Sequence, residues 1–230
     1  MTKKIMFNDK YCLTRAVLNG RKTMTRRKLT LTLDKKVDGK LIRVYPSKVF
    51  FDNGKWLFNY EGKTYFLPKE NYPAYNVGEV VAIAQSYEVV YAEKIADFIR
   101  HNYHFPREDA AEKFKKVYEN CAGWKNKMFV KADLMPHHIK ITDVKVERLQ
   151  DISDEDILRE GVKRASIGFY AGGVKVKDCE KEAHRETASG CLKLFPFPRP
   201  AFASLIDKIS GKGTWESNPW VAAYSFELVD

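Results

Sequence analysis

The segment from Gly20 to Arg27 holds the residues of this chain that are best placed by type and spacing to do chemistry. It reads Gly-Arg-Lys-Thr-Met-Thr-Arg-Arg, so cationic and hydroxyl side chains that could donate to phosphate or carbonyl oxygens follow one another closely. If the segment runs extended, Thr23 and Thr25 share one face, whereas a turn would bring Lys22 and Thr25 together. The segment therefore predicts a binding or catalytic loop, and the alternative is an exposed basic loop without a ligand.

Positive charge is concentrated at the start of the chain. The 230 residues carry a formal net charge of +10, but residues 1–50 hold 14 Lys and Arg against three acidic residues, and the remainder is nearly neutral. A local excess of this sign attracts polyanions such as nucleic acid, although a lysine-rich face that only aids solubility is the alternative. We expect one continuous positive surface that includes the four cations of the segment: Arg21, Lys22, Arg26 and Arg27.

Motifs for metals and cofactors are missing. The sequence has no phosphate-binding GxxxxGK[ST] loop, no GxGxxG, no GxSxG and no HExxH. Neither the pair His101 and His104 nor the set Cys179, His184 and Cys191 has the spacing of a zinc site. We therefore expect no metal and no cofactor.

Composition favours a globular protein without a membrane span. Hydrophobic residues make up 44% and charged residues 30%, the mean hydropathy is −0.44, and no apolar run is long enough to cross a bilayer. The N-terminus lacks the apolar stretch of a secretory leader, and the four cysteines lie far apart. These observations predict a cytoplasmic protein with reduced cysteines in its core.

Strand patterns occur in five parts of the chain. Residues 40–67 read as a β-meander, with an Asn53-Gly54 hairpin turn between two apolar runs. Further strands are expected at residues 80–84, at 128–130, over 139–149 and from Val221 to Val229.

Helical patterns fall between these strands. We expect a helix from Asn8 or Asp9 to about Asn19, two helices within residues 91–120 that are separated by Pro106, and an amphipathic helix near 202–209. Ser153 followed by Asp156 resembles a capping box, which predicts a helix that begins there and ends before Gly161.

Three blocks in this order resemble the ASCH domain family, a group of PUA-like folds associated with RNA. They are Gly20–Arg27, the strand entry Val77-Gly78-Glu79-Val80-Val81, and Val144–Ile152 with the acidic helix that leads to Glu160-Gly161. Residues 202–226, with the Asn218-Pro219-Trp220 motif, are similar to phage and prophage ASCH-domain proteins. The resemblance implies an α+β fold in which a small, partly open β-barrel with a central cleft is flanked by helices. It also implies a single domain over residues 1–230, with insertions at about 30–70, 91–122 and 163–200.

The resemblance assigns roles to three residues. Small ASCH-type amidohydrolases that remove acyl groups from N4-acetylcytidine use a lysine, a threonine and a glutamate, and Lys22, Thr25 and Glu160 occupy the matching positions. A lysine with a lowered pKa can take the threonine proton, the threonine oxygen can attack an amide carbonyl, and the glutamate can protonate the leaving amine. Without the resemblance, an ion pair of Glu160 with Arg159 or Lys163 is the simpler interpretation.

This chain departs from its phage relatives after the second block. Where they carry Arg-Glu-Thr-Trp, it has Ala84-Gln85-Ser86-Tyr87, in which Gln85 could bind a base edge and Tyr87 could stack on a base. Trp124 and Lys131 are further candidates for a nucleic-acid-binding rim.

Taken together, these features favour an intracellular ASCH-domain protein that binds a nucleotide or an RNA segment in a basic cleft. One alternative is an amidohydrolase acting on N4-acylated cytidine or a similar modified base. A nuclease is the other alternative, for which the sequence shows neither an acidic metal cluster nor a catalytic histidine pair.

Overall fold

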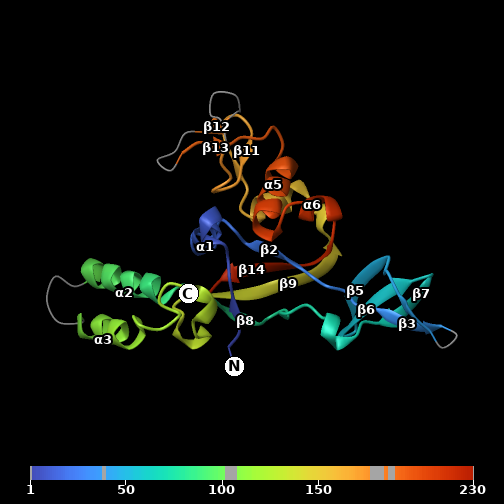
Figure 1. Ribbon diagram of the computed structural model, residues 1–230, viewed down its shortest axis with the longest axis horizontal. Coiled ribbons are helices and arrows are strands. Elements are labelled where there is room, and N and C mark those ends of the chain that lie inside the picture. The colour runs from blue at the N-terminus through green and yellow to red at the C-terminus, as the bar shows by residue number, and fades with distance from the viewer. Residues whose placement is uncertain (1, 38–39, 102–107, 177–183, 186–189, 230) are drawn as a thin grey trace. The chain divides into compact units, whose positions relative to one another are not determined.

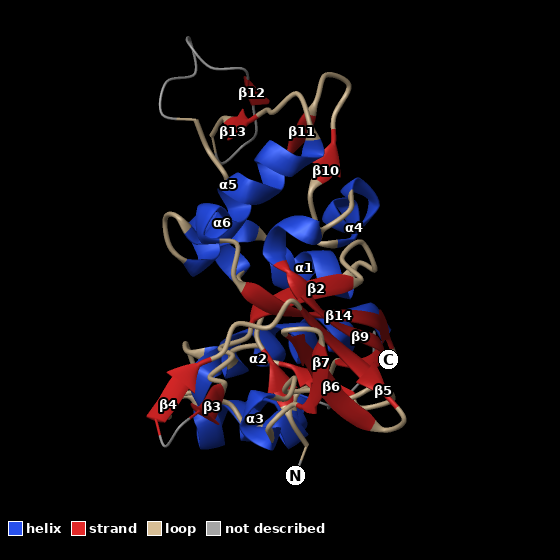
Figure 2. Cartoon of the chain, turned by 90° about the vertical axis from the view of Figure 1, so that its right-hand side faces the viewer, coloured by secondary structure: helices blue, strands red, loops and turns tan. Residues whose placement is uncertain are grey.

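The computed structural model describes residues 2–37, 40–101, 108–176, 184–185 and 190–229. The chain forms two compact units, each assembled from segments that are far apart in the sequence. The first unit comprises residues 1–8, 80–140 and 228–230, and the second comprises 9–79 and 141–227. The sequence predicts a single domain with insertions, and Figures 1 and 2 show the elements that make up the two units.

A small sheet and two helices make up most of the first unit. Strand β1 (Lys4–Ile5) pairs in parallel with β8 (Val80–Ile83), and β8 pairs antiparallel with the first residues of β9 (His138–Arg148). Helices α2 (Tyr87–His101) and α3 (Glu108–Tyr118) lie side by side (Figure 1). The expected strand at residues 80–84 and two helices within 91–120 are confirmed, although α2 begins four residues early, and Pro106 lies outside the described residues.

The strand expected at residues 128–130 is wrong. Met128 and Phe129 lie in a 3-10 helix over Lys127–Phe129, Val130 follows its end, and a second 3-10 helix covers Ala132–Leu134. The Asn126 side chain accepts a hydrogen bond from the backbone N–H of Met128 at 3.0 Å, which closes a turn where the apolar run alone indicated extended backbone.

The second unit is built on three strands, with β14 (Trp220–Leu228) between β9 and β2 (Met24–Lys28). Strands β14 and β2 are antiparallel, and their register sets Thr25 opposite Tyr224 and Met24 opposite Ser225. Nearly the whole of β14 is buried, as expected for a central strand.

Two small sheets of the second unit lie within residues 30–70, where the resemblance predicts an insertion. Strand β3 (Asp34–Val37) pairs with β4 (Lys40–Arg43), while β5 (Lys48–Asp52), β6 (Lys55–Tyr60) and β7 (Lys63–Phe66) form an antiparallel meander (Figure 2). The Asn53-Gly54 turn is confirmed: both residues have positive φ, 47° and 77°, as a two-residue turn of this type requires.

Helices and short strand pairs complete the second unit. The helices are α1 (Leu13–Leu18), α4 (Asp154–Arg159), α5 (Pro198–Ser210) and α6 (Thr214–Ser217), with 3-10 helices at Asp9–Tyr11, Lys69–Asn71 and Leu149–Asp151. Strands β10 (Lys163–Arg164) and β11 (Phe169–Tyr170) form one antiparallel pair, and β12 (His184–Arg185) and β13 (Leu192–Lys193) form another.

The starts of two helices in this unit can be compared with the starts predicted from the sequence. The cap at Ser153 is confirmed, because its hydroxyl accepts a hydrogen bond from the N–H of Asp156 at 3.1 Å. The continuous helix expected from Asn8 or Asp9 is wrong, because Cys12 has a left-handed backbone (φ 56°) that separates a 3-10 turn from α1.

The α+β class is confirmed, and the barrel stays a prediction. Among the described strands, no sheet closes on itself. Cys12 and Cys121 are free, as expected, but they are exposed rather than in the core, and the expectation of a reduced cysteine is wrong for Cys191, which is disulfide-bonded. Within the described part of the chain, no helix combines the length and the apolar character needed to cross a membrane.

Candidate functional site

A buried ion pair joins Lys22 to Glu160 in the second unit. The Lys22 amine donates to the Oε2 atom of Glu160 at 2.6 Å and to the backbone carbonyl of the same residue at 2.8 Å. The side chains are 2% and 5% exposed. Two residues that are 138 positions apart, and that the family resemblance singled out, are thus brought into direct contact.

The loop between α1 and β2 holds Lys22 in place through its backbone. Gly20 adopts a φ of 66°, which ends α1, and the N–H groups of Arg21 and Lys22 both donate to the carbonyl of Ala16. The N–H of Thr23 donates to the carbonyl of Arg159 at 3.0 Å. The loop is therefore fastened to the last turn of α4, directly before Glu160.

Arg26 extends the pair into a larger charge cluster. Its guanidinium lies 2.7 Å from Glu147, 3.2 Å from Asp156 and 3.2 Å from the Oε1 atom of Glu160, and the side chain is 1% exposed. Each carboxylate oxygen of Glu160 therefore faces a different cation. Because an arginine fork can serve several acceptors at once, Arg26 joins β2 to both β9 and α4.

Burial and charge act in opposite directions on these groups. Burial lowers the pKa of the Lys22 amine, the nearby Glu160 carboxylate raises it, and the effect of burial is the larger. For Arg26 burial also lowers the pKa, but Glu160 and Glu147 together outweigh it, so its pKa rises. Of these two cations, Lys22 is consequently the one whose pKa is lowered.

Thr25 lies nearby on β2 but faces away from Arg26. Alternation along the strand sets Met24 and Arg26 on one face, where the Arg26 guanidinium contacts the sulfur of Met24, and sets Thr25 on the other face beside Tyr224. Thr25 is buried, and its hydroxyl makes no hydrogen bond to any other described residue. The structure thus brings Lys22 and Glu160 together. The hydroxyl of Thr25, three residues after Lys22, does not take part in this contact.

The continuous positive surface expected for this segment is wrong. Arg21 is exposed and Arg27 is half-buried, but Lys22 and Arg26 are buried against carboxylates. The acids that neutralise them come from residues 147–160, far along the chain. Local charge composition revealed the cations and could not reveal their distant partners.

The other four predicted binding residues belong to the first unit, where two of them are core residues. Tyr87 is 2% exposed and packs against the aromatic rings of α3. Gln85 is also buried and donates to Glu93 at 2.7 Å. Neither can stack on a base or read its edge in this arrangement, so those two roles are wrong. Trp124 is partly buried against the same core, and Lys131 is exposed.

Sequence reasoning overlooked Glu147 and Asp156. Both lie in segments that had been singled out for other reasons: Glu147 in the third family block, and Asp156 as an acidic residue in the first turn of α4. The available signal was that Arg26 shares a strand face with the apolar Met24, because a guanidinium buried on such a face requires carboxylates.

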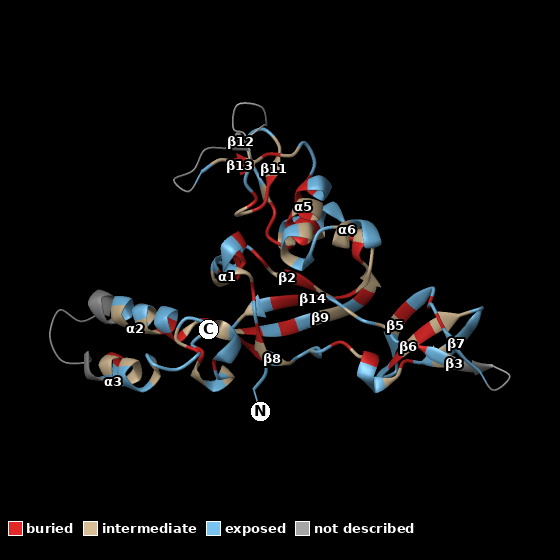
Figure 3. Ribbon diagram, in the orientation of Figure 1, coloured by how far each residue is buried: buried red, intermediate tan, exposed pale blue. Residues whose placement is uncertain are grey.

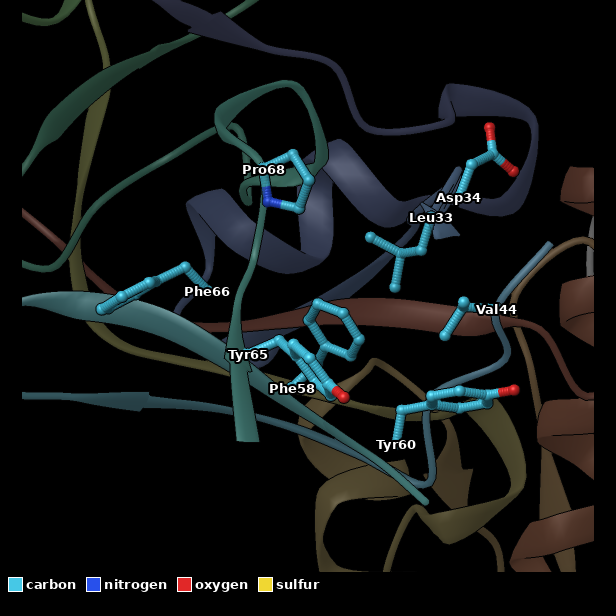
Figure 4. Close-up of a pocket in the computed structure, with 8 residues that line it drawn as sticks. All are labelled: Leu33, Asp34, Val44, Phe58, Tyr60, Tyr65, Phe66 and Pro68. Atoms are coloured by element: carbon cyan, nitrogen blue, oxygen red, sulfur yellow. The ribbon is translucent and has the colours of Figure 1, made fainter. Parts of the chain in front are cut away.

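Two cavities lie away from this cluster. One, of about 210 Å³ in the second unit, is lined by Leu33, Asp34, Val44, Phe58, Tyr60, Tyr65, Phe66 and Pro68 (Figure 4). The other, of about 500 Å³ in the first unit, includes Glu93, Asp97 and His137. Neither is lined by Lys22, Thr25 or Glu160. Across the described ranges, no three His, Cys, Asp or Glu side chains are grouped so as to hold a metal ion.

Comparison with known proteins adds no relative from which a role could be transferred. No protein-family model matches the chain, and no curated protein and no solved structure matches it. The resemblance to the ASCH domain family therefore stays a prediction that rests on three sequence blocks.

Proposed function

We propose that this protein is an amidohydrolase that removes an acyl group from a modified nucleobase, of which N4-acylated cytidine is the leading example. The observation that carries the proposal is the buried contact of 2.6 Å between the Lys22 amine and the Glu160 carboxylate. Binding of a nucleotide by the same cations has less support, because Lys22 and Arg26 are already paired with acids.

The pair can supply a base and an acid without exchanging protons with water. Transfer of one proton from the Lys22 amine to Oε2 of Glu160 converts the ion pair into a neutral amine and a neutral carboxylic acid. Burial favours this neutral form because it removes two charges from a poorly solvated site, while Arg26 opposes it by stabilising the carboxylate. Arg26 therefore sets how often the reactive form is populated.

The reaction follows from these protonation states. The neutral Lys22 amine takes the proton of the Thr25 hydroxyl, and the Thr25 oxygen attacks the carbonyl carbon of the substrate amide. The protonated Glu160 then donates to the leaving amine of the base as the C–N bond breaks, which leaves the acyl group as an ester on Thr25. Water hydrolyses this ester, releases the carboxylic acid and restores the hydroxyl.

Catalysis by Thr25 requires one rearrangement. In the structure the Lys22 amine is directed to Glu160, and the Thr25 hydroxyl is not in contact with it. On substrate binding the amine gives up its bond to the Glu160 carbonyl and turns to Thr25.

A nucleoside panel tests the proposal directly. Purified protein is incubated with N4-acetylcytidine and related acylated nucleosides, and formation of the deacylated nucleoside and the carboxylic acid is followed by chromatography. We expect Lys22→Met, Thr25→Val and Glu160→Gln each to reduce turnover by about 100-fold or more. Thr23→Val is the matched control. It removes a neighbouring hydroxyl that accepts a hydrogen bond from Arg159 and has no role in the proposed reaction. A folded protein that turns over no member of the panel, or a fully active Thr25→Val variant, contradicts the proposal.

The pH profile provides a second readout. The reactive pair carries a single proton, so activity should fall in alkaline solution when that proton is lost. Since burial lowers the pKa of Lys22, this fall should begin below the usual range of a lysine. A rate that keeps rising through that range would contradict the shared-proton arrangement.

A further inference from the structure

The sheet of β5, β6 and β7 has two faces of different character. Alternation directs Val49, Trp56 and Phe58 to one face, where they are buried in a hydrophobic core. Residues on the other face are half-buried or exposed. Figure 3 colours each residue of these strands by its burial. We call this second surface the open face; it comprises Lys48, Phe50, Asp52, Lys55, Leu57, Asn59, Thr64 and Phe66.

An apolar row crosses all three strands of the open face. Phe50 of β5 is directly opposite Leu57 of β6, and Leu57 is directly opposite Phe66 of β7. Side chains at directly opposed positions lie about 5 Å apart, so the three form one continuous strip. Phe66 is 67% exposed, and in Figure 4 its ring points away from the group of side chains around Leu33 and Phe58.

Lysine side chains accompany both aromatic rings of this row. The amine of Lys48 lies 5.4 Å from the centre of the Phe50 ring, and that of Lys55 lies 4.9 Å from the centre of the Phe66 ring. Asn59 and Thr64, which are hydrogen-bonded to each other at 3.0 Å, add polar groups between the strands. Asp52 is the one acidic residue of the open face.

This combination fits one class of partner. Exposed rings on a sheet offer flat surfaces for unpaired bases, and lysines beside each ring offer charge for the phosphates between them. Interface cores between protein copies are depleted in lysine, so lysines over both rings disfavour self-association through this face. The residues that define the open face carry two lysines against one aspartate, a local excess of positive charge that favours a polyanion.

We infer that the open face of the β5–β7 sheet binds single-stranded nucleic acid, with Phe50 and Phe66 stacking on bases and Lys48 and Lys55 contacting phosphates. A base that stacks on Phe66 displaces the Lys55 amine from the ring, and the flexible lysine then reaches the neighbouring phosphate. This site is separate from the Lys22–Glu160 pair and is independent of the proposed hydrolysis.

Fluorescence anisotropy of labelled oligonucleotides tests the inference with the full chain. The probes are a 12-nucleotide oligo-uridine, the matching oligo-thymidine and a duplex of the same length. We expect both single strands to bind more tightly than the duplex, and their ratio shows whether RNA or DNA is preferred. Phe66→Ala and Phe50→Ala should each weaken binding by about 5-fold to 100-fold.

Phe51→Ala is the matched control, because Phe51 is also exposed, at 56%, but projects from the opposite face and packs on Trp56. Lys48→Ala and Lys55→Ala should each reduce the slope of log affinity against log salt by about 0.7. Circular dichroism confirms that each variant is folded.

Several results would overturn the inference. They are the absence of single-strand binding, equal losses for Phe66→Ala and Phe51→Ala, and binding that depends on Arg21 while Phe66→Ala has no effect. A dimer in sedimentation experiments that Phe66→Ala dissociates, in protein that binds no oligonucleotide, would instead identify a second copy as the partner. Because none of these measurements uses an acylated nucleoside, failure here leaves the hydrolysis test unaffected.

Discussion

The Lys22–Glu160 cluster and the open face draw on the same residue types for opposite purposes. In the cluster, two cations from residues 20–27 are buried against three carboxylates. On the open face, Lys48 and Lys55 remain exposed beside aromatic rings. Both regions contain basic residues in the sequence, but only the lysines of the open face remain exposed and can contact a polyanion.

The two regions show that burial, rather than local charge, determines whether the cations of a basic segment are available to a ligand. A buried cation is held by its partners and can tune protonation, whereas an exposed cation is solvated and can exchange partners. Stability measurements can separate the two regimes, since removal of a cation should be costly in one region and nearly neutral in the other.

The largest effect is expected for Arg26→Met. The substitution leaves the carboxylates of Glu147, Asp156 and Glu160 without their shared cation, and breaking a buried pair in this way costs about 3–5 kcal/mol. Urea unfolding measures the loss. Arg159→Met is the control, because the Arg159 side chain is 38% exposed and forms an ion pair with Asp156, so it should cost about 1 kcal/mol. Equal losses for the two variants would show that burial does not distinguish them.

An intermediate effect is expected for Ser153→Ala. The Ser153 hydroxyl caps α4, the helix that carries Asp156 and leads to Glu160, and loss of such a cap costs about 1 kcal/mol. Thermal and urea unfolding should show this loss, and Ser153→Asp should restore most of the stability because aspartate is also a good cap. If Ser153→Ala also lowered hydrolysis more than stability, the cap would have a role in positioning Glu160.

The smallest effect is expected on the open face. Lys48→Ala and Lys55→Ala should change the free energy of unfolding by less than about 0.5 kcal/mol. Both side chains are exposed, and neither forms a salt bridge with another described residue. A loss close to that of Arg26→Met would mean that these lysines support the fold, and would remove the contrast between the two regions.

Features encoded locally could be predicted from the sequence. The Asn53-Gly54 turn and the Ser153 cap each depend on a few neighbouring residues, and both are confirmed. The run at residues 128–130 failed because one side chain, that of Asn126, competes for the backbone and closes a turn.

The candidate site was only partly accessible from the sequence. Nothing local requires Lys22 to meet Glu160, and the resemblance to a family supplied that pairing before the structure placed the two side chains in contact. The surroundings of Arg26, by contrast, depend on how β9 and α4 pack against β2, which neither periodicity nor composition encodes. Burial of Tyr87 and Gln85 was missed for the same reason.

The fastening of the Lys22 loop to the end of α4 has a consequence for biosynthesis. The basic segment leaves the ribosome long before residues 147–160 exist, so Lys22 and Arg26 begin as solvated cations with no acidic partners. Their contacts span more than 120 positions, which delays them until most of the chain has been made. The nascent protein thus passes from an early stage with an open, strongly basic N-terminal segment to a late stage in which that charge is neutralised.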